Sequence, residues 1–139
     1  MTNVVFPAAE LLAPEEEIEL ARRMEAGTLA AAVLTGEREF SAATVAELTA
    51  LAREGRAARE RYVEANLRLV AMVAYPAARR AGLSFTELFQ EGAGGLLLAV
   101  DRFDHTQRVR FATYALPWIR EQVSRAVGNR CGALPLSGF

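Results

Sequence analysis

Apolar residues recur three and four positions apart along most of this 139-residue chain, most clearly within residues 18–24 and 45–52. That spacing places them on one face of an α-helix. No segment alternates apolar and polar residues for long enough to predict a useful β-strand. The sequence therefore predicts an all-α fold, a compact helical bundle of about five helices.

Prolines, glycines and capping residues suggest where the first helices begin and end. Pro14 suits a first helical position, three glutamates follow it, and Gly27 is expected to end that helix. Residues 28–40 are then expected to form a loosely packed connection. Ser41 is a plausible N-cap for a second helix over 42–54, which Gly55 would end.

Three further helices are expected in the rest of the chain. A long one runs over about 56–80, with a kink at Pro76 and a stop at Gly82. Ser84 and Glu87 have capping-box spacing and would open a helix over 85–102. Because glycine inside a helix costs about 1 kcal/mol relative to alanine, Gly92 and Gly95 suggest a closely approaching backbone. The last helix is expected over 111–130.

Composition excludes several classes of protein. Hydrophobic residues make up 52% of the chain, which is enough for one domain with a core. No apolar run approaches the roughly 20 residues that span a bilayer, and the N-terminus lacks the basic start of a secretion signal, so we expect a cytoplasmic protein without membrane contact. The single cysteine, Cys131, and single histidine, His105, cannot supply an internal disulfide or a zinc site.

No pattern of catalytic residues is present in the sequence. We find no phosphate-binding loop, no paired carboxylates in a metal pattern and no nucleophile beside a base. The glycine-rich string QEGAGG falls within a predicted helix and lacks the lysine and hydroxyl of a nucleotide-binding loop. We therefore predict neither an enzyme nor a cofactor.

The net charge of −1 conceals an uneven distribution. Residues 10–64 carry twelve glutamates and seven arginines, a balance of −5, whereas residues 101–130 carry six arginines and three acidic residues, a balance of +3. The C-terminal third is thus the part suited to a polyanion such as nucleic acid. A charge-mixed, solvated face is the alternative reading of the same residues.

Four segments in register carry a family resemblance. They are EANLRLV at 64–70, FTELFQEGAGGLLLAVDRFD at 85–104, RFATYALPWIREQVSRA at 110–126 and LLAPEEEIELARRMEAG at 11–27. Together they resemble the second conserved domain of bacterial sigma-70 family RNA polymerase sigma factors, with its preceding helix, of the primary, actinobacterial-like type. The resemblance implies one domain over 1–139, with 11–27 as the preceding helix, 28–60 as a family-variable insertion and 61–130 as the polymerase- and promoter-binding core.

In that family, the helix matching 85–100 docks onto a coiled coil of the largest subunit of core RNA polymerase. The resemblance implies polymerase contacts by Glu87, Leu88, Gln90 and Glu91. Carboxylates and an amide on one helical turn suit an arginine-rich partner, because charge-assisted hydrogen bonds orient as well as attract. Ala93 departs from the family, which usually has asparagine there. From spacing alone, a solvated polar face is the alternative.

The resemblance also implies contact with the non-template strand of an opened minus-ten promoter element. Unpaired bases stack on aromatic rings, and cations follow their phosphates. The residues at the matching DNA-binding positions are Asn66, Phe103, Arg110, Phe111, Thr113, Tyr114, Trp118, Arg120, Ser124 and Arg125. Without this context, Tyr114 and Trp118 would more often be core or partner packing.

Departures from the family pattern cluster in the same region. Val109 replaces a stacking tyrosine, Pro117 replaces the first tryptophan of a pair, Glu121 replaces a glutamine and Arg108 a glycine. Pro117 also removes the amide that would bond to the carbonyl of Thr113, at a cost of about 3 kcal/mol unless the helix bends or starts later.

The resemblance is compatible with two functions. The first is a sigma-factor-like transcription initiation protein that binds core RNA polymerase and contacts the minus-ten strand. The alternative is a degenerate sigma-like regulator or decoy that binds polymerase, or another transcription protein, without melting DNA. A helical bundle serving an unrelated partner is a third reading. A small regulatory protein is a further candidate partner, and recognition of a two-part promoter is not expected of this chain alone.

Overall fold

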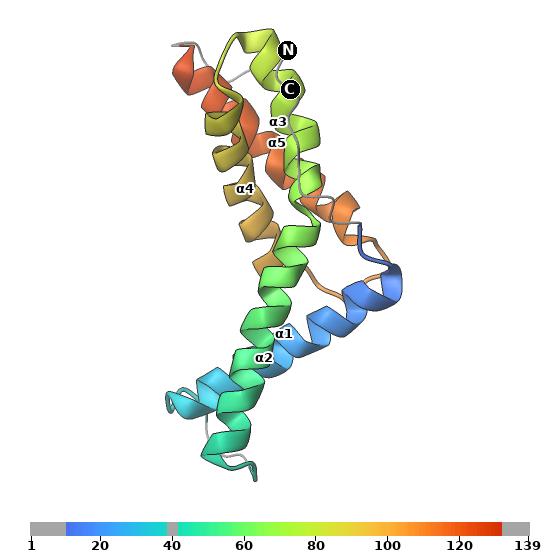
Figure 1. The fold of residues 1–139 in the computed structure, drawn as a ribbon, viewed down its shortest axis with the longest axis vertical. Coiled ribbons are helices and arrows are strands. Elements are labelled where there is room, and N and C mark those ends of the chain that lie inside the picture. The colour runs from blue at the N-terminus through green and yellow to red at the C-terminus, as the bar shows by residue number, and fades with distance from the viewer. Residues whose placement is uncertain (1–10, 39–41, 132–139) are drawn as a thin grey trace. The chain divides into compact units, whose positions relative to one another are not determined.

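The computed structural model describes residues 11–38 and 42–131, and within them the secondary structure is entirely helical (Figure 1). The helices are α1 (Pro14–Leu34), α2 (Val45–Ala65), α3 (Leu67–Ala81), α4 (Phe85–Arg102) and α5 (Phe111–Arg130). This confirms the all-α prediction. The backbone divides into two compact units, one formed by Leu11–Glu64 and the other containing the described residues from Ala65 onward.

Helix α1 begins where the sequence predicts but ends later. Its first residue is Pro14, and the Ala13 amide donates to Glu16 Oε1 at 3.2 Å. The prediction that Gly27 ends the helix is wrong, because α1 continues to Leu34. Gly27 instead packs against α2, where an added Cβ would lie 2.7 Å from the Cα of Gly55.

Helix α2 differs from its prediction at both ends. It begins at Val45 and is capped by Thr44, whose hydroxyl accepts from the Glu47 amide at 3.1 Å while Glu47 Oε2 accepts from the Thr44 amide at 3.2 Å. The predicted cap, Ser41, lies outside the described residues. Gly55 is inside α2, so the expected stop there is wrong for the same reason as at Gly27.

A small apolar cluster joins the two helices of this unit. It consists of the buried Ala30, Leu48 and Ala52, with partly buried side chains around them. Because Ala30 lies on α1, the predicted loose connection over 28–40 is wrong for residues 28–34, which are helical. The small side chains of Ala30 and Ala52 allow the two helices to approach closely.

The predicted helix over 56–80 is divided at Asn66, which has φ −104° and ψ 3° and separates α2 from α3. Helix α3 continues through Pro76. Gly82 ends it in the left-handed conformation, with φ 65°, as the sequence predicts.

Helices α3, α4 and α5 pack around a common core. Ser84 caps α4 by accepting from the Glu87 amide at 3.4 Å, and α4 and α5 have the predicted bounds. The prediction of a closely approaching backbone is confirmed at Gly95 but is wrong at Gly92, where the neighbouring atoms belong to side chains. A Cβ on Gly92 would lie 2.9 Å from Val70 Cγ1 on α3, and one on Gly95 would lie 2.6 Å from the Trp118 carbonyl oxygen on α5. The large side chains buried in this core include Val70, Leu88, Leu96, Phe111, Ile119 and Val123.

None of the helices in the part of the chain that the structure describes is both long and apolar enough to cross a membrane.

Candidate nucleic-acid interface

Helix α5 buries one side and presents two neighbouring faces outward. Successive residues of a helix are rotated by about 100°, so positions 110, 114, 118, 121 and 125 fall within one narrow sector. Positions 113, 117, 120 and 124 fall within the adjacent sector. Core side chains such as Ala115, Ile119 and Val123 occupy the opposite side. The α5 residues that the sequence predicts to bind DNA therefore lie on these two outward faces, except Phe111.

Two aromatic residues of the first face, Tyr114 and Trp118, form a connected chain of rings with Phe103, which caps the C-terminal end of α4. Phe103 lies 5.2 Å from Tyr114 between ring centroids, and Tyr114 lies 6.2 Å from Trp118. All three are partly exposed. We call Phe103, Tyr114 and Trp118 the aromatic surface. Their tilted arrangement leaves ring area accessible, which is the requirement for stacking on unpaired bases.

Phe111 has a different position from the one a stacking role requires. It is 0% exposed and contacts Phe103 edge-on, with centroids 5.3 Å apart. Its ring therefore supports the aromatic surface from inside the core. Asn66 is also buried, at 4% exposure, and lies directly before the first residue of α3. The sequence could not predict that the side chains of Phe111 and Asn66 are buried, because phenylalanine and asparagine both occur in protein cores and at protein surfaces.

A hydrogen-bonded turn shapes the connection between α4 and α5. Asp104 Oδ1 accepts from the Thr106 hydroxyl at 2.6 Å and from the Thr106 amide at 2.9 Å. The hydroxyl bond, followed by the amide bond, holds the pKa of Asp104 below its ordinary value. The imidazole ring of His105 contacts the ring of Phe103, with ring centroids 4.9 Å apart. The turn therefore fixes the chain beside Phe103.

The arginines of α4 and α5 near the aromatic surface differ in their contacts. Arg110 and Arg120 are exposed, but Arg125 Nη2 lies 2.8 Å from Glu121 Oε1, so part of its charge is compensated. Arg102, at the end of α4, places its guanidinium carbon 5.2 Å from the centroid of the Trp118 ring. Sequence reasoning missed Arg102, and the available signal was an arginine directly before Phe103 in the string VDRFD.

The departures from the family pattern are at the surface. Val109 is 46% exposed in the connection before α5, and Pro117 is exposed within α5, beside Thr113 and Arg120 on the second face. Helix α5 begins at Phe111 and continues through Pro117. The exposed residues of this region thus include a valine before α5 and a proline on α5, where a strand-binding surface would benefit from rings.

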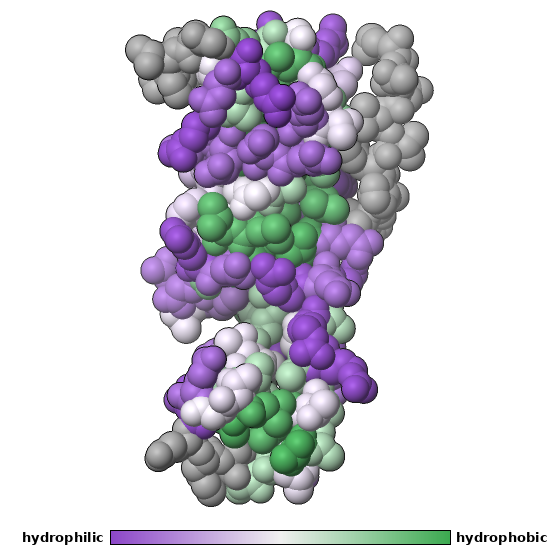
Figure 2. Space-filling view, turned by 90° about the vertical axis from the view of Figure 1, so that its left-hand side faces the viewer, coloured by the Kyte–Doolittle hydropathy of each residue, from purple (hydrophilic) through white to green (hydrophobic). Residues whose placement is uncertain are grey.

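The outer face of α4 carries three of the four residues predicted to contact polymerase. Glu87, Gln90 and Glu91 are exposed, whereas Leu88 is 1% exposed and belongs to the core. Glu87 Oε2 lies 3.1 Å from Arg130 Nη1 at the end of α5. Leu97, also exposed, adds an apolar residue to α4. Figure 2 faces the side on which α4 lies in Figure 1, and it shows a hydrophobic patch bordered by hydrophilic residues.

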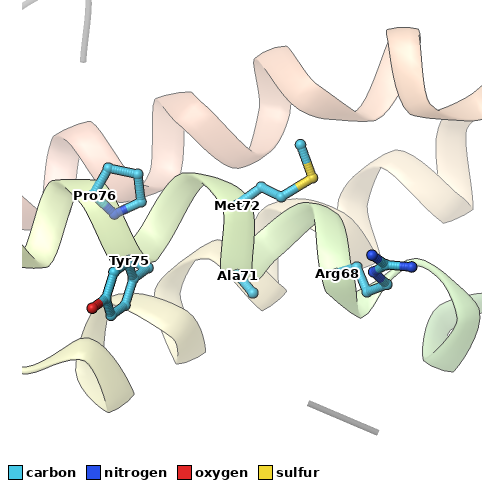
Figure 3. Close-up of a pocket in the computed structure, with 5 residues that line it drawn as sticks. All are labelled: Arg68, Ala71, Met72, Tyr75 and Pro76. Carbon is cyan, nitrogen blue, oxygen red and sulfur yellow. The ribbon is translucent and has the colours of Figure 1, made fainter. Parts of the chain in front are cut away.

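A shallow hollow lies along α3. It is lined by Arg68, Ala71, Met72, Tyr75 and Pro76, which come from successive turns of the helix (Figure 3). Its lining is mostly apolar, with one guanidinium. Within residues 11–38 and 42–131, no cluster of three histidine, cysteine or acidic side chains could hold a metal ion.

Comparison with known proteins identifies the α3–α5 unit. Residues 62–130 match the sigma-70 region 2 family. The RNA polymerase principal sigma factor HrdD of Streptomyces griseus is 39% identical over 130 residues, which is 91% of this chain and 38% of the relative. HrdD of Streptomyces viridifaciens is 41% identical over 129 residues, with the same shares. The chain spans about two fifths of the length of these relatives.

These matches confirm the resemblance inferred from the four sequence segments. The helical unit with the aromatic surface is a sigma-70 region 2. The chain therefore belongs to the sigma-70 family of RNA polymerase sigma factors.

Proposed function

We propose that this chain is a non-enzymatic, cytoplasmic transcription initiation protein that binds core RNA polymerase and contacts the non-template strand of an opened minus-ten element. The single observation that carries the proposal is the aromatic surface on a region 2 helix, partly exposed and flanked by arginines. An exposed chain of rings with nearby cations suits single-stranded DNA, since every base can stack and every phosphate attracts charge.

Polymerase binding is assigned to the outer face of α4. Glu87, Gln90 and Glu91 place two carboxylates and an amide on adjoining turns, all exposed. These groups suit a basic partner helix, and Leu97 on the same helix adds an apolar contact. Leu88 supports the face from the core instead of touching the partner.

The two halves of the proposal can be tested separately. Gln90→Ala combined with Glu91→Ala should weaken capture of core polymerase by at least tenfold in a pull-down, while Trp118→Ala should leave capture unchanged. With core polymerase present, Trp118→Ala should instead weaken binding of a fluorescent minus-ten single strand by about 5- to 100-fold, the loss of one stacked base. Wild-type chain that captures no core polymerase would contradict the proposal.

A second candidate, a regulator that binds polymerase without melting DNA, is favoured by Val109, Pro117 and the Glu121–Arg125 ion pair. Each of these reduces the stacking area or free positive charge that a strand requires. Under this candidate, the wild-type complex binds the strand weakly, and Val109→Tyr with Pro117→Trp raises its affinity more than tenfold. Strong wild-type binding without such a gain would favour the first candidate.

A further inference from the structure

One face of α3 combines exposed apolar atoms with a cation at each end. Because successive residues of a helix are rotated by about 100°, five residues share a sector of about that width. They are Arg68, Met72, Tyr75, Pro76 and Arg79, and we call them the α3 face. Met72 is 65% exposed, Pro76 and both arginines are exposed, and the shallow hollow extends along this face from Arg68 to Pro76 (Figure 3).

The apolar part of the α3 face is partly held in place. Tyr75 contacts Phe85 on α4 edge-on, with ring centroids 6.0 Å apart, and Phe85 in turn lies 5.6 Å from Phe89. A partner that packs on Tyr75 therefore orders few side chains that were free before binding. Met72, with its unbranched and polarizable side chain, can adapt to the shape of the partner.

The charges of the α3 face have one sign. Helix α3 contains three arginines and no acidic residue. In the described part of the chain, neither Arg68 nor Arg79 forms an ion pair. They are eleven positions apart, which is about 16 Å along the helix axis. The surface between them is mostly apolar, so it suits a partner with carboxylates near its ends and apolar side chains between them.

This spacing favours a protein partner over a nucleic acid. A single strand carries several phosphates over that length, and the α3 face offers one ring and no cation between its two ends. An amphipathic helix instead presents a continuous apolar stripe, read by anchors at helical spacing, and can carry an acidic residue at each end of the stripe.

We propose that the α3 face is a docking surface for an acidic amphipathic helix of another protein. Apolar side chains of that helix pack on Met72, Tyr75 and Pro76. Its carboxylates bind the guanidinium groups at the two ends of the face. The inference goes beyond the proposed function, which assigns no residue of the α3 face to polymerase or to DNA.

The probe for this surface is a displayed library of helical peptides of about 18 residues, with one face randomised. Peptides that bind the Met72→Glu variant are removed first, and the rest are selected on the full wild-type chain. Because Met72 is 65% exposed, this variant should keep the wild-type circular dichroism spectrum and thermal transition. The selected peptides should carry two acidic residues about eleven positions apart, with apolar residues between them at helical spacing.

Fluorescence anisotropy of one selected, fluorescein-labelled peptide then tests the charges. Arg68→Gln combined with Arg79→Gln should weaken its binding about two- to thirtyfold, the range for two exposed ion pairs, and should reduce the salt dependence. Arg68→Glu combined with Arg79→Glu should bind the peptide more weakly still. This doubly reversed variant should prefer a peptide in which lysines replace the two acidic residues.

Helix α2 supplies the matched controls. Arg53→Gln combined with Arg56→Gln removes the same charge from two exposed positions and should leave the peptide affinity nearly unchanged. Val45→Glu is the counterpart of Met72→Glu, because Val45 is 71% exposed. It should bind the selected peptide as wild type does.

Each contrary outcome overturns a stated part of the inference. Failure to enrich any peptide would overturn the docking surface. Selected peptides without paired acidic residues, or with equal affinity for the Arg68→Gln and Arg79→Gln variant, would overturn the partner chemistry. Single-stranded DNA that binds the free chain and loses affinity with Met72→Glu would make the face a nucleic-acid surface. Capture of core polymerase by Met72→Glu should equal wild type, so the proposed function and this inference fail separately.

Discussion

Packing requires glycine at two of the three glycine positions in α4 but not at the third. Gly92 and Gly95 face neighbouring helices, and an added Cβ at either would lie under 3.0 Å from another atom. Gly94 has nothing within 4 Å of such a Cβ and is exposed. Gly94 therefore bears the helix cost of glycine without a packing requirement inside the chain.

Gly94→Ala should raise the free energy of unfolding by about 0.5–1 kcal/mol, because alanine is the better helix former and meets no atom. Urea denaturation followed by circular dichroism measures the change. Gly95→Ala is the control, and it should lower stability by about 1–3 kcal/mol, since its Cβ would lie 2.6 Å from the backbone oxygen of Trp118. Equal effects of the two substitutions would contradict this account.

The ion pair on the side of α5 that we propose to face DNA leads to a second prediction. Glu121→Gln should release Arg125, whose guanidinium is now 2.8 Å from the carboxylate, and should remove a negative charge from the surface. Affinity of the polymerase complex for a minus-ten single strand should rise about two- to tenfold, with a steeper salt dependence, as measured by anisotropy. Stability should change by less than about 0.5 kcal/mol, because such pairs on exposed helices contribute little.

Glu19→Gln provides a matched comparison. It breaks the Arg23–Glu19 pair, which has the same spacing on α1 and a distance of 3.1 Å. It should leave strand affinity unchanged, and an equal rise with both variants would point to net charge instead of Arg125.

At the scale of elements, the connection between α4 and α5 should respond to acid. The folded pKa of Asp104 is lowered by its bonds from Thr106. Stability from these bonds is therefore present above the ordinary value of 3.8 and is lost as the pH falls through the lowered pKa. Carboxyl NMR of Asp104 should show titration below 3.8 in wild type, and a return toward 3.8 in Thr106→Val. A titration unaffected by Thr106→Val would refute the assignment.

The sequence predicted the α3–α5 elements better than α1 and α2, for a physical reason. Ser84 and Gly82 act through local backbone geometry, which a short segment specifies. Gly27 and Gly55 act through a contact between distant segments, and glycine is also a common helix terminator. The local pattern alone could not separate these two uses. Likewise, no spacing indicated that the long helix would divide at Asn66.

The candidate site was predicted in its residue types more than in its arrangement. Tyr114 and Trp118 were expected to share a face because they are four positions apart, and their rings do contact each other. Their contact with Phe103, and that of Arg102 with Trp118, depends on how α4 packs on α5. Contacts between helices have no signature in the spacing of one segment.

At the scale of the whole molecule, two units lead to a prediction about independent folding. The core of the unit from Ala65 onward is made by α3, α4 and α5 and holds the largest buried side chains of those helices. A chain of residues 65–139 should therefore fold by itself, giving a helical circular dichroism spectrum and a cooperative thermal transition. A spectrum without helix would show that this unit requires residues 11–64. The single-domain organisation over 1–139 stays a prediction.

The contact between Gly27 and Gly55 should be difficult to detect by methods that infer contacts from correlated substitutions among related sequences. Residues that touch usually reveal it by changing together, a larger side chain at one position being matched by a smaller one at the other. Here each added Cβ would meet the partner's Cα at 2.7 Å, and neither residue can become smaller. No compensating pair of substitutions exists at this crossing. Chains that keep this crossing should show two invariant positions without co-variation, so such methods would not detect this contact between α1 and α2.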